Sequence, residues 1–173
     1  MSRGYTKCLT IIDQFTRFPE AIPLENADAD TVAVELIRHW ISRYGVPLRI
    51  TSDQGTQFSA VLFQALMRIL GVKYLRTTPY HPASNGLVER LHRQLKAALL
   101  CHNDIWFDAL PAVLLRLRAA WKEDLQATPV ELVYGEPIRI PGELLVPSNK
   151  HADAPGVLQD LQAHFNNLAP AET

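Results

Sequence analysis

Cysteine is scarce in this chain of 173 residues, which holds only Cys8 and Cys101. The two lie far apart among apolar residues, and neither has a His or a second Cys at the spacing of a zinc site. The pattern predicts buried, reduced thiols in an intracellular protein, and argues against a disulfide scaffold. Long apolar runs and a signal segment after Met1 are also missing, so neither a membrane span nor secretion is predicted.

Net charge is nearly absent too, at −1, and gives no global argument for a nucleic-acid partner. Its distribution is uneven, because residues 1–122 carry 15 Lys and Arg against 10 Asp and Glu, whereas residues 123–173 carry 2 against 8. The first region is suited to phosphate, and the second would be repelled by it. Ordinary scatter of surface charge is the alternative explanation of these totals.

The hydrophobic pattern alternates between strands and helices, with 47% apolar and 20% charged residues, as expected of one globular domain of the α/β class. A turn over Asp13–Thr16 joins the first two strands. Strands are predicted over Tyr5–Ile12, Arg17–Leu24, Pro47–Thr51 and Val72–Thr77. Helices are predicted over Thr31–Tyr44, Val61–Leu70, Leu87–Leu100, Ile105–Arg118 (with a kink or break at Pro111), Thr128–Tyr134 and Val157–Leu168.

Asp53 and Glu89, with 35 residues between them, stand in two distinctive runs, Thr51–Phe58 (TSDQGTQF) and His81–Arg90 (HPASNGLVER). Asp53 follows a predicted strand, at the end where α/β sheets usually expose their chemistry. Phosphodiester chemistry is served by two divalent metal ions about 3.5–4 Å apart. Hard cations prefer the oxygen ligands of Asp and Glu. The sequence therefore makes both residues candidate ligands of Mg²⁺ or Mn²⁺.

The helix that carries Glu89 has two faces. Glu89, Arg93 and Lys96 share one face, which would place two cations beside a metal ligand, as suits a DNA strand. A simpler explanation is an exposed helix with a Glu–Arg pair worth about 0.3–0.5 kcal/mol. The other face is apolar and can meet the core; it consists of Leu91, Leu95, Ala98 and Leu99.

These runs and their spacing closely resemble the catalytic core of retroviral-type integrases. Three wider segments look like gypsy-type LTR retrotransposons in particular: Cys8–Pro23 (CLTIIDQFTRFPEAIP), Trp40–Pro47 (WISRYGVP) and Tyr80–Leu99 (YHPASNGLVERLHRQLKAAL). Trp121–Gly142 resembles the segment that follows the core. The resemblance covers about 140 of the 173 residues. It implies a ribonuclease H-like α/β fold, a mixed sheet flanked by helices, and metal-dependent joining of element DNA ends to a target.

The resemblance also assigns roles to single residues. Asp53 and Glu89 match the second and third members of the catalytic triad, which holds Mg²⁺ or Mn²⁺ in the family. Asn85 matches the loop-to-helix junction before the glutamate. Arg93 and Lys96 match helix positions that touch DNA. DNA is therefore the expected partner, a homodimer is possible in this family, and a chain acting on host DNA would work in the nucleus.

Other parts of the chain take their expected roles from the same resemblance. His81 and Pro82 match a mobile loop. Residues 1–122 correspond to a partial integrase catalytic core, residues 123–146 to a post-core segment, and residues 147–173 to a linker and C-terminal tail.

The first catalytic aspartate has no clear counterpart. In the family it lies on a central strand just before a Ser-Arg-Gly-Tyr segment, and this sequence begins at Met1-Ser-Arg-Gly-Tyr5. Asp13 fits the turn that closes the first hairpin, so it is expected to bond nearby backbone N–H groups and is the weakest candidate for a third ligand. The expected fold lacks the usual first central strand, which would leave two strands with unpaired edges.

The leading expectation is thus a truncated, inactive integrase core. One alternative is a domesticated nucleic-acid-binding module that keeps Arg93 and Lys96, with weak and salt-sensitive affinity. Another is a dimerisation module whose interface includes Trp106, Phe107 and Trp121, although such aromatics more often belong to a core. Activity would survive if Asp13 served as the third ligand, or if the natural protein extended upstream of Met1.

Overall fold

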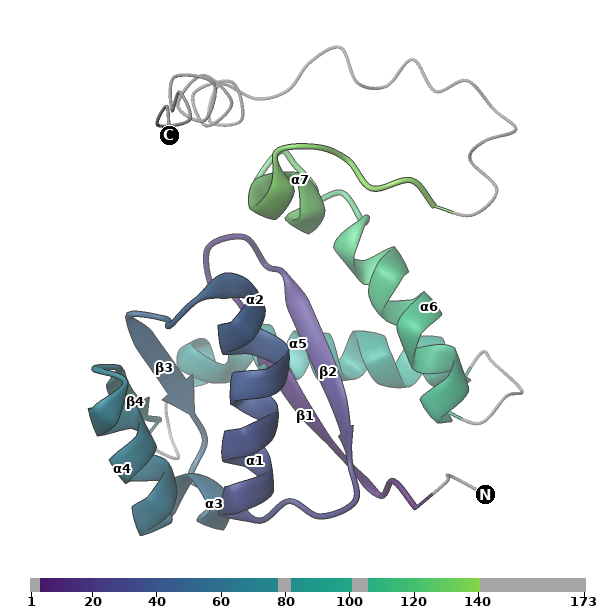
Figure 1. Ribbon diagram of the computed structural model, residues 1–173. Coiled ribbons are helices and arrows are strands. Elements are labelled where there is room, and N and C mark those ends of the chain that lie inside the picture. Colours follow the sequence, from purple (N-terminus) through teal and green to yellow (C-terminus); the bar gives the residue numbers. More distant parts are fainter. Residues whose placement is uncertain (1–3, 78–81, 101–105, 141–173) are drawn as a thin grey trace, which may run out of the picture. The chain divides into compact units, whose positions relative to one another are not determined.

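The computed structural model describes residues 4–77, 82–100 and 106–140 of the chain (Figure 1). The chain divides into two compact units. Unit 1 comprises Met1–Ile12 and Glu20–Pro111, and unit 2 comprises Asp13–Pro19 and Ala112–Thr173. The predicted helix over Val157–Leu168 lies outside the described residues. No helix in the described ranges is long and apolar enough to cross a membrane.

A hairpin opens unit 1. Strand β1 spans Lys7–Ile12 and pairs with β2, which spans Pro19–Leu24. The predicted second strand begins two residues too early, because Arg17 has a φ of 60°, which takes the backbone out of the extended region. Almost every residue of β2 is buried, whereas β1 is half-buried at best. The prediction of buried thiols is wrong for Cys8, which is exposed at the start of β1.

A helical run covers one face of the hairpin. It consists of α1 (Ala29–Leu36), a π-helical segment η1 (Ile37–Ile41) and α2 (Ser42–Tyr44). The side chain of Asp28 accepts a hydrogen bond from the Thr31 backbone N–H at 2.8 Å, so the helix begins two residues earlier than predicted. The predicted stop is confirmed at Gly45, where φ is 80°.

A second sheet contains β3 (Arg49–Ser52) and β4 (Lys73–Arg76) in parallel, with Arg49 opposite Lys73 and Ser52 opposite Arg76. The connection between them contains α4 (Val61–Ile69), as predicted. It also contains a short α3 (Thr56–Ser59) that the sequence pattern does not predict. Parallel strands need such a long connection, and a helix within it covers the sheet.

One apolar cluster holds these elements together. It joins β2, α1, η1 and α4, and α1 contacts α4 directly. The most buried large side chains are Phe63, at 1% exposed, and Met67, at 2%. The buried members are Ile22, Leu24, Val32, Ala33, Leu36, Trp40, Phe63, Met67 and Val72. All of these buried members precede position 73, and Ile50 of β3 and Tyr74 of β4 pack against the cluster.

Helix α5 spans Pro82–Leu100 and contacts β1. Figure 1 draws α1 in front of the β1–β2 hairpin and α5 behind it. The prediction of a start at Leu87 is wrong by five residues, because proline is compatible with the first helical position, where its missing N–H has no intrahelical partner. Leu91 and Leu95 are buried, which confirms the predicted core-facing stripe at these two positions.

Helix α6 spans Trp106–Arg118 and continues through Pro111, so the alternative of a break at that proline is wrong. A proline at this position removes one N–H donor and its ring crowds the carbonyl four residues earlier, and the helix accommodates both. Within unit 1, the ring of Phe107 stacks on that of Tyr5 with 4.8 Å between centroids. Trp106 and Phe107 are partly buried, whereas Trp121 is 50% exposed.

Unit 2 is organised around Phe18 and α7 (Pro129–Tyr134). Thr128 and Glu131 form a capping box at the start of α7, which confirms the predicted helix start. Phe18 is 2% exposed and packs edge-on against Tyr134. The Arg118 guanidinium lies 4.8 Å from the Phe18 ring centroid, and its Nε donates to the Pro19 carbonyl at 3.1 Å. A buried aromatic and a cation–π contact therefore hold the turn residues to α6.

The described residues thus form two two-stranded sheets, one a hairpin and one parallel, together with flanking helices. The predicted mixed α/β architecture is confirmed. In the described part of the chain, β1 pairs only with β2 and β3 pairs only with β4. Strands β1 and β3 therefore each have one edge without a strand neighbour among the described residues.

Candidate metal and nucleic-acid site

Asp53 directly follows β3 and is exposed. One carboxylate oxygen, Oδ1, accepts a hydrogen bond from the Gly55 backbone N–H at 2.9 Å. The described residues provide no hydrogen-bond partner for the second oxygen. The carboxylate is therefore oriented by one contact while most of its lone pairs face solvent, as a metal ligand requires.

The backbone that carries Asp53 is fixed by contacts from β4. The Tyr74 hydroxyl is 2.6 Å from the Ser52 Oγ, and Ser52 Oγ also donates to the Asp53 carbonyl at 2.8 Å. The backbone N–H of Thr77 donates to the Ser52 carbonyl at 3.0 Å, and Gln54 Nε2 donates to the Thr77 carbonyl at 3.3 Å. The residues on both sides of Asp53 are thus tied to the end of β4.

Glu89 lies on the exposed side of α5, opposite the buried Leu91 and Leu95. The expected alternative use of Glu89, an ion pair with Arg93 one turn further along the helix, does not form within 4 Å among the described residues. The carboxylate therefore points to solvent without a protein partner in the described part of the chain, and it is available to a cation.

The predicted DNA contacts lie on the same helix. Arg93 and Lys96 are both exposed, and neither has a carboxylate partner among the described residues. Asn85 belongs to α5, but its side chain lies outside the described part of the chain, as does His81 altogether. One hydrogen bond fixes this helix against β1, because Thr10 Oγ1 lies 2.7 Å from His92 Nε2. The sequence pattern does not predict this contact, since His92 has no distinguishing motif.

Asp13 has a different environment. Its Oδ2 accepts from the backbone N–H groups of Phe15 and Thr16, at 3.1 and 2.7 Å, and from the Thr16 hydroxyl at 2.9 Å. These contacts are those expected of an aspartate that closes a hairpin turn. Three donors on one oxygen make this carboxylate a structural part of the turn.

The described residues contain no group of three or more His, Cys, Asp or Glu side chains that could hold a metal ion. Asp53 and Glu89 consequently offer two exposed carboxylates, and their joint role as ligands stays a prediction. Two carboxylates are a donor set that Mg²⁺ accepts when waters and phosphate oxygens complete its shell.

Known proteins resemble this chain in sequence and in fold. Residues 1–82 match the family model described as integrase core domain. The catalytic core domain of BIV integrase superposes with a TM-score of 0.61 and 29% identity over 72% of this chain and 82% of that one. A chain of the simian T-cell lymphotropic virus intasome, solved with the PP2A regulatory subunit B56 gamma, gives a TM-score of 0.66 at 24% identity, over 84% of this chain and 52% of that one. The chain thus has the ribonuclease H-like fold of integrase cores.

Parts of two retroviral polyproteins are also similar to this chain in sequence. The Gag-Pol polyprotein of Walleye dermal sarcoma virus is 40% identical over 136 residues, 76% of this chain and 8% of the polyprotein. That of Feline leukemia virus is 34% identical over 139 residues, 78% of this chain and 8% of the polyprotein. The chain spans less than a tenth of the length of these two relatives.

Proposed function

We propose that the chain is the catalytic-core portion of a DNA integrase from a gypsy-type LTR retroelement. The observation that carries the proposal is the pair of exposed carboxylates, Asp53 at the end of β3 and Glu89 on α5, in a chain with the integrase-core fold. The gypsy-type assignment is supported by the three sequence segments that look like that group. A chain that joins element DNA to host DNA would act in the nucleus.

Asp53 and Glu89 would hold Mg²⁺ or Mn²⁺. A bound ion of this kind would polarise a phosphodiester and lower the pKa of a nucleophilic water or hydroxyl. The protein's own contribution is orientation. The Gly55 N–H fixes the Asp53 carboxylate, and the Thr10–His92 hydrogen bond fixes the helix that carries Glu89. Arg93 and Lys96 would bind backbone phosphates beside the two carboxylates.

We further propose that this 173-residue chain by itself does not join DNA strands. Two carboxylates give an incomplete two-metal site, so cation binding should be weak. Asp13 is a poor substitute because three hydrogen-bond donors already orient its Oδ2 within the hairpin turn. The β3–β4 sheet that supports Asp53 also has no third strand in the described residues.

A second candidate function is non-catalytic DNA binding, and one specific observation favours it. Arg93 and Lys96 remain exposed and unpaired by carboxylates in the described part of the chain, so they can meet phosphate whether or not a metal binds. Assembly is a third candidate, because Trp121 is half exposed and the neighbour in the intasome structure belongs to an assembly. Light scattering would test it, and a strictly monomeric mass would reject a homodimer.

Titration with Mn²⁺ tests the proposed metal site. Isothermal calorimetry should detect weak binding to the unaltered chain and its loss in both Asp53→Asn and Glu89→Gln. Asp13→Asn is the matched control, since it removes one aspartate charge from a turn and should leave the affinity within twofold. Equal losses in all three variants would mean that binding reflects charge alone, and would reject the assignment.

Joining of a labelled DNA end to a target duplex in Mg²⁺ tests the predicted inactivity. We expect no product above background. Joining that depends on Asp53 would contradict the proposed inactivity. Joining that also depends on Asp13 would show that Asp13 supplies the third ligand. Salt-dependent binding of duplex without any joining would support the non-catalytic alternative.

A further inference from the structure

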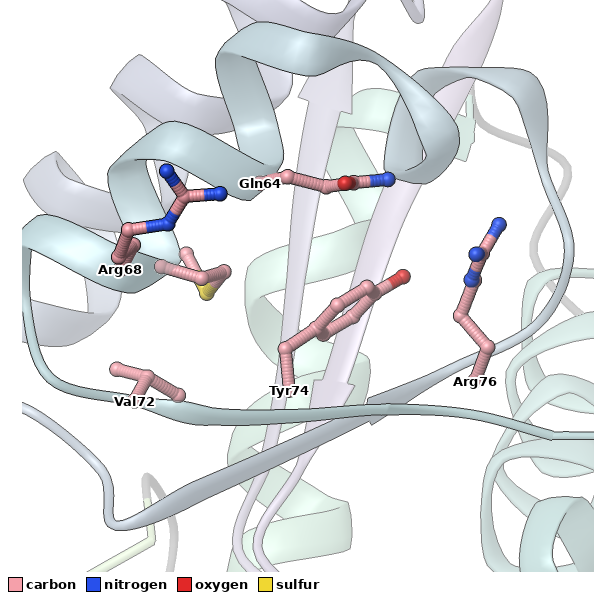
Figure 2. A pocket seen from close by; sticks show the side chains of 6 residues that line it. Gln64, Arg68, Val72, Tyr74 and Arg76 are labelled. Carbon is pink, nitrogen blue, oxygen red and sulfur yellow. The ribbon is translucent and has the colours of Figure 1, made fainter.

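A cavity of about 360 Å³ opens between α4 and β4, outside the set of Asp53, Glu89, Arg93 and Lys96 (Figure 2). Its lining follows the periods of the two elements. Three residues spaced i, i+3, i+4 come from one face of α4, and three spaced i, i+2, i+4 come from one face of β4 and the residue before it. The lining residues are Gln64, Met67, Arg68, Val72, Tyr74 and Arg76.

The floor and one wall of this cavity consist of side chains packed in the core. Met67 and Val72 are 2% and 7% exposed, so their side chains belong to the apolar core. The Tyr74 ring packs edge-on against the buried Phe63 with 5.6 Å between centroids, and its hydroxyl bonds to Ser52. A ligand would therefore meet a preformed surface at the bottom and flexible side chains only at the rim.

Two guanidinium groups stand at that rim. Figure 2 shows Arg68 and Arg76 on either side of Tyr74, with the Gln64 amide above it. Both arginines are exposed, and no carboxylate lies within ion-pair distance of either among the described residues. Arg76 Nη1 contacts the Ser59 hydroxyl at 3.5 Å, the long limit of a hydrogen bond. The cavity thus offers donors and two positive charges without a compensating acid in the described part of the chain, which suits an oxyanion.

We propose that this cavity binds one phosphodiester group of the DNA backbone and so positions the duplex relative to Asp53. The proposal rests on the proposed function for its choice of DNA. Arg76 lies opposite Ser52 in the sheet register, so it stands at the same end of the sheet as Asp53. The volume exceeds what one phosphate fills, which leaves room for the sugars that flank it.

Duplex binding measured in EDTA tests this site in the absence of divalent metal ions. The affinity of a fluorescent duplex is determined by anisotropy over a range of salt concentrations for Arg68→Gln, Arg76→Gln and the double variant. Each single variant should weaken binding by about tenfold. The slope of log affinity against log salt should fall in magnitude by about 0.9, as for one lost phosphate contact. The double variant should lose less than the product of the two, since both arginines hold one phosphate.

Arg49→Gln is the matched control, because Arg49 is also exposed and lies at the end of β3 away from Asp53. It should change the affinity by less than twofold, and circular dichroism should show that all variants keep their helices. Losses in Arg49→Gln equal to those in the cavity variants, or fully additive losses in the double variant, would overturn the proposal. The proposed metal site would be unaffected, since Mn²⁺ titration tests it separately.

Binding of free inorganic phosphate is the second test of this site. Addition of inorganic phosphate should shift the NMR signals of the Arg68 and Arg76 side-chain N–H groups, and should not shift those of Arg49. Phosphate binding together with unchanged duplex affinity in the cavity variants would assign the cavity to a free anion and reject the DNA contact. Absence of any shift, with unchanged duplex affinity, would reject an oxyanion site altogether.

Discussion

The turn at Asp13 and the turn at Asp53 are built from the same pattern, Asp-Gln-X-Thr directly after a strand, with Phe15 as X in one and Gly55 as X in the other. In the first turn, one carboxylate oxygen accepts three hydrogen bonds, from the N–H groups of Phe15 and Thr16 and from the Thr16 hydroxyl. In the second, the carboxylate accepts one hydrogen bond, from the Gly55 N–H.

The difference between the two turns arises from the element that each tetrapeptide leads into. After Asp13 the chain reverses into β2, so the threonine stays within the turn and its hydroxyl reaches back to the carboxylate. After Asp53 the chain enters α3 at Thr56, and the Gly55 carbonyl accepts the first helical hydrogen bonds. Thr56 is therefore the first residue of α3 and not part of the turn. Asp13 is therefore a structural acceptor within its turn, whereas Asp53 keeps its second carboxylate oxygen for solvent or a ligand.

The largest expected effect compares how much the side chains packed near each turn contribute to the free energy of unfolding. Phe63→Ala should lower the free energy of unfolding by about 3–5 kcal/mol, because Phe63 is 1% exposed and contacts Phe58 and Tyr74 near the Asp53 turn. Phe15→Ala removes the same number of atoms from the Asp13 turn, where Phe15 is 66% exposed, and should cost no more than about 0.5 kcal/mol. Urea denaturation measures both; similar losses would mean that the Asp53 turn does not depend on the core.

The next effect concerns the two carboxylates themselves. Asp13→Ala should destabilise the fold by about 1–2 kcal/mol, because it leaves the Phe15 and Thr16 N–H groups without their acceptor. Asp53→Ala removes one exposed hydrogen bond and should cost about 0.5 kcal/mol. Midpoints of urea unfolding at pH 7 give the comparison. A larger loss for Asp53→Ala would reverse the assignment of the structural and the ligand aspartate.

The order of the strands and of the longer helices is predictable from the sequence, because these elements have a clear hydrophobic period and several end at Gly or a capping residue. The four-residue α3 is too short to show such a period. The bonding of Asp13 to backbone N–H groups of its own turn is also predictable, since aspartate after a strand commonly accepts such bonds in a tight turn. The start of α5 is not, because Gly86 and Asn85 disfavour helix locally and favour a start at Leu87. Their local propensity is weaker than the capacity of the proline at position 82 to start a helix.

The cavity beside β4 could not be predicted from sequence. Arg68 and Arg76 look like ordinary surface cations, and only the packing of α4 on β4 brings them to one opening. The same holds for the bond between Tyr74 and Ser52, because it joins residues on two strands whose register is a tertiary property. The alternation of Val72, Tyr74 and Arg76 was the one available signal, and it indicates a shared face without saying what lies opposite.

A smaller effect tests whether contacts from β4 hold the Asp53 turn in place. Tyr74→Phe keeps the ring contact with Phe63 but removes the hydroxyl that bonds to Ser52, and should cost about 1 kcal/mol. Hydrogen exchange at the Gly55 amide should accelerate, while exchange at the Thr16 amide should change less. Equal acceleration at both amides would indicate a global loss of stability, and the proposed local support of Asp53 would be wrong.

The smallest effect comes from a third aspartate, Asp28, which caps α1. Hydrogen bonds from the Thr31 backbone and side chain hold the pKa of this fully exposed carboxyl below its ordinary value of 3.8. Because the pKa is lower in the folded state, the contribution to stability is present above pH 3.8 and disappears as the pH falls through the lowered value. Asp28→Asn keeps a capping oxygen that does not titrate. The difference in urea midpoint between the unaltered chain and Asp28→Asn should therefore change only below pH 3.8. A change confined to neutral pH would show that Asp28 acts through long-range charge and not through its cap.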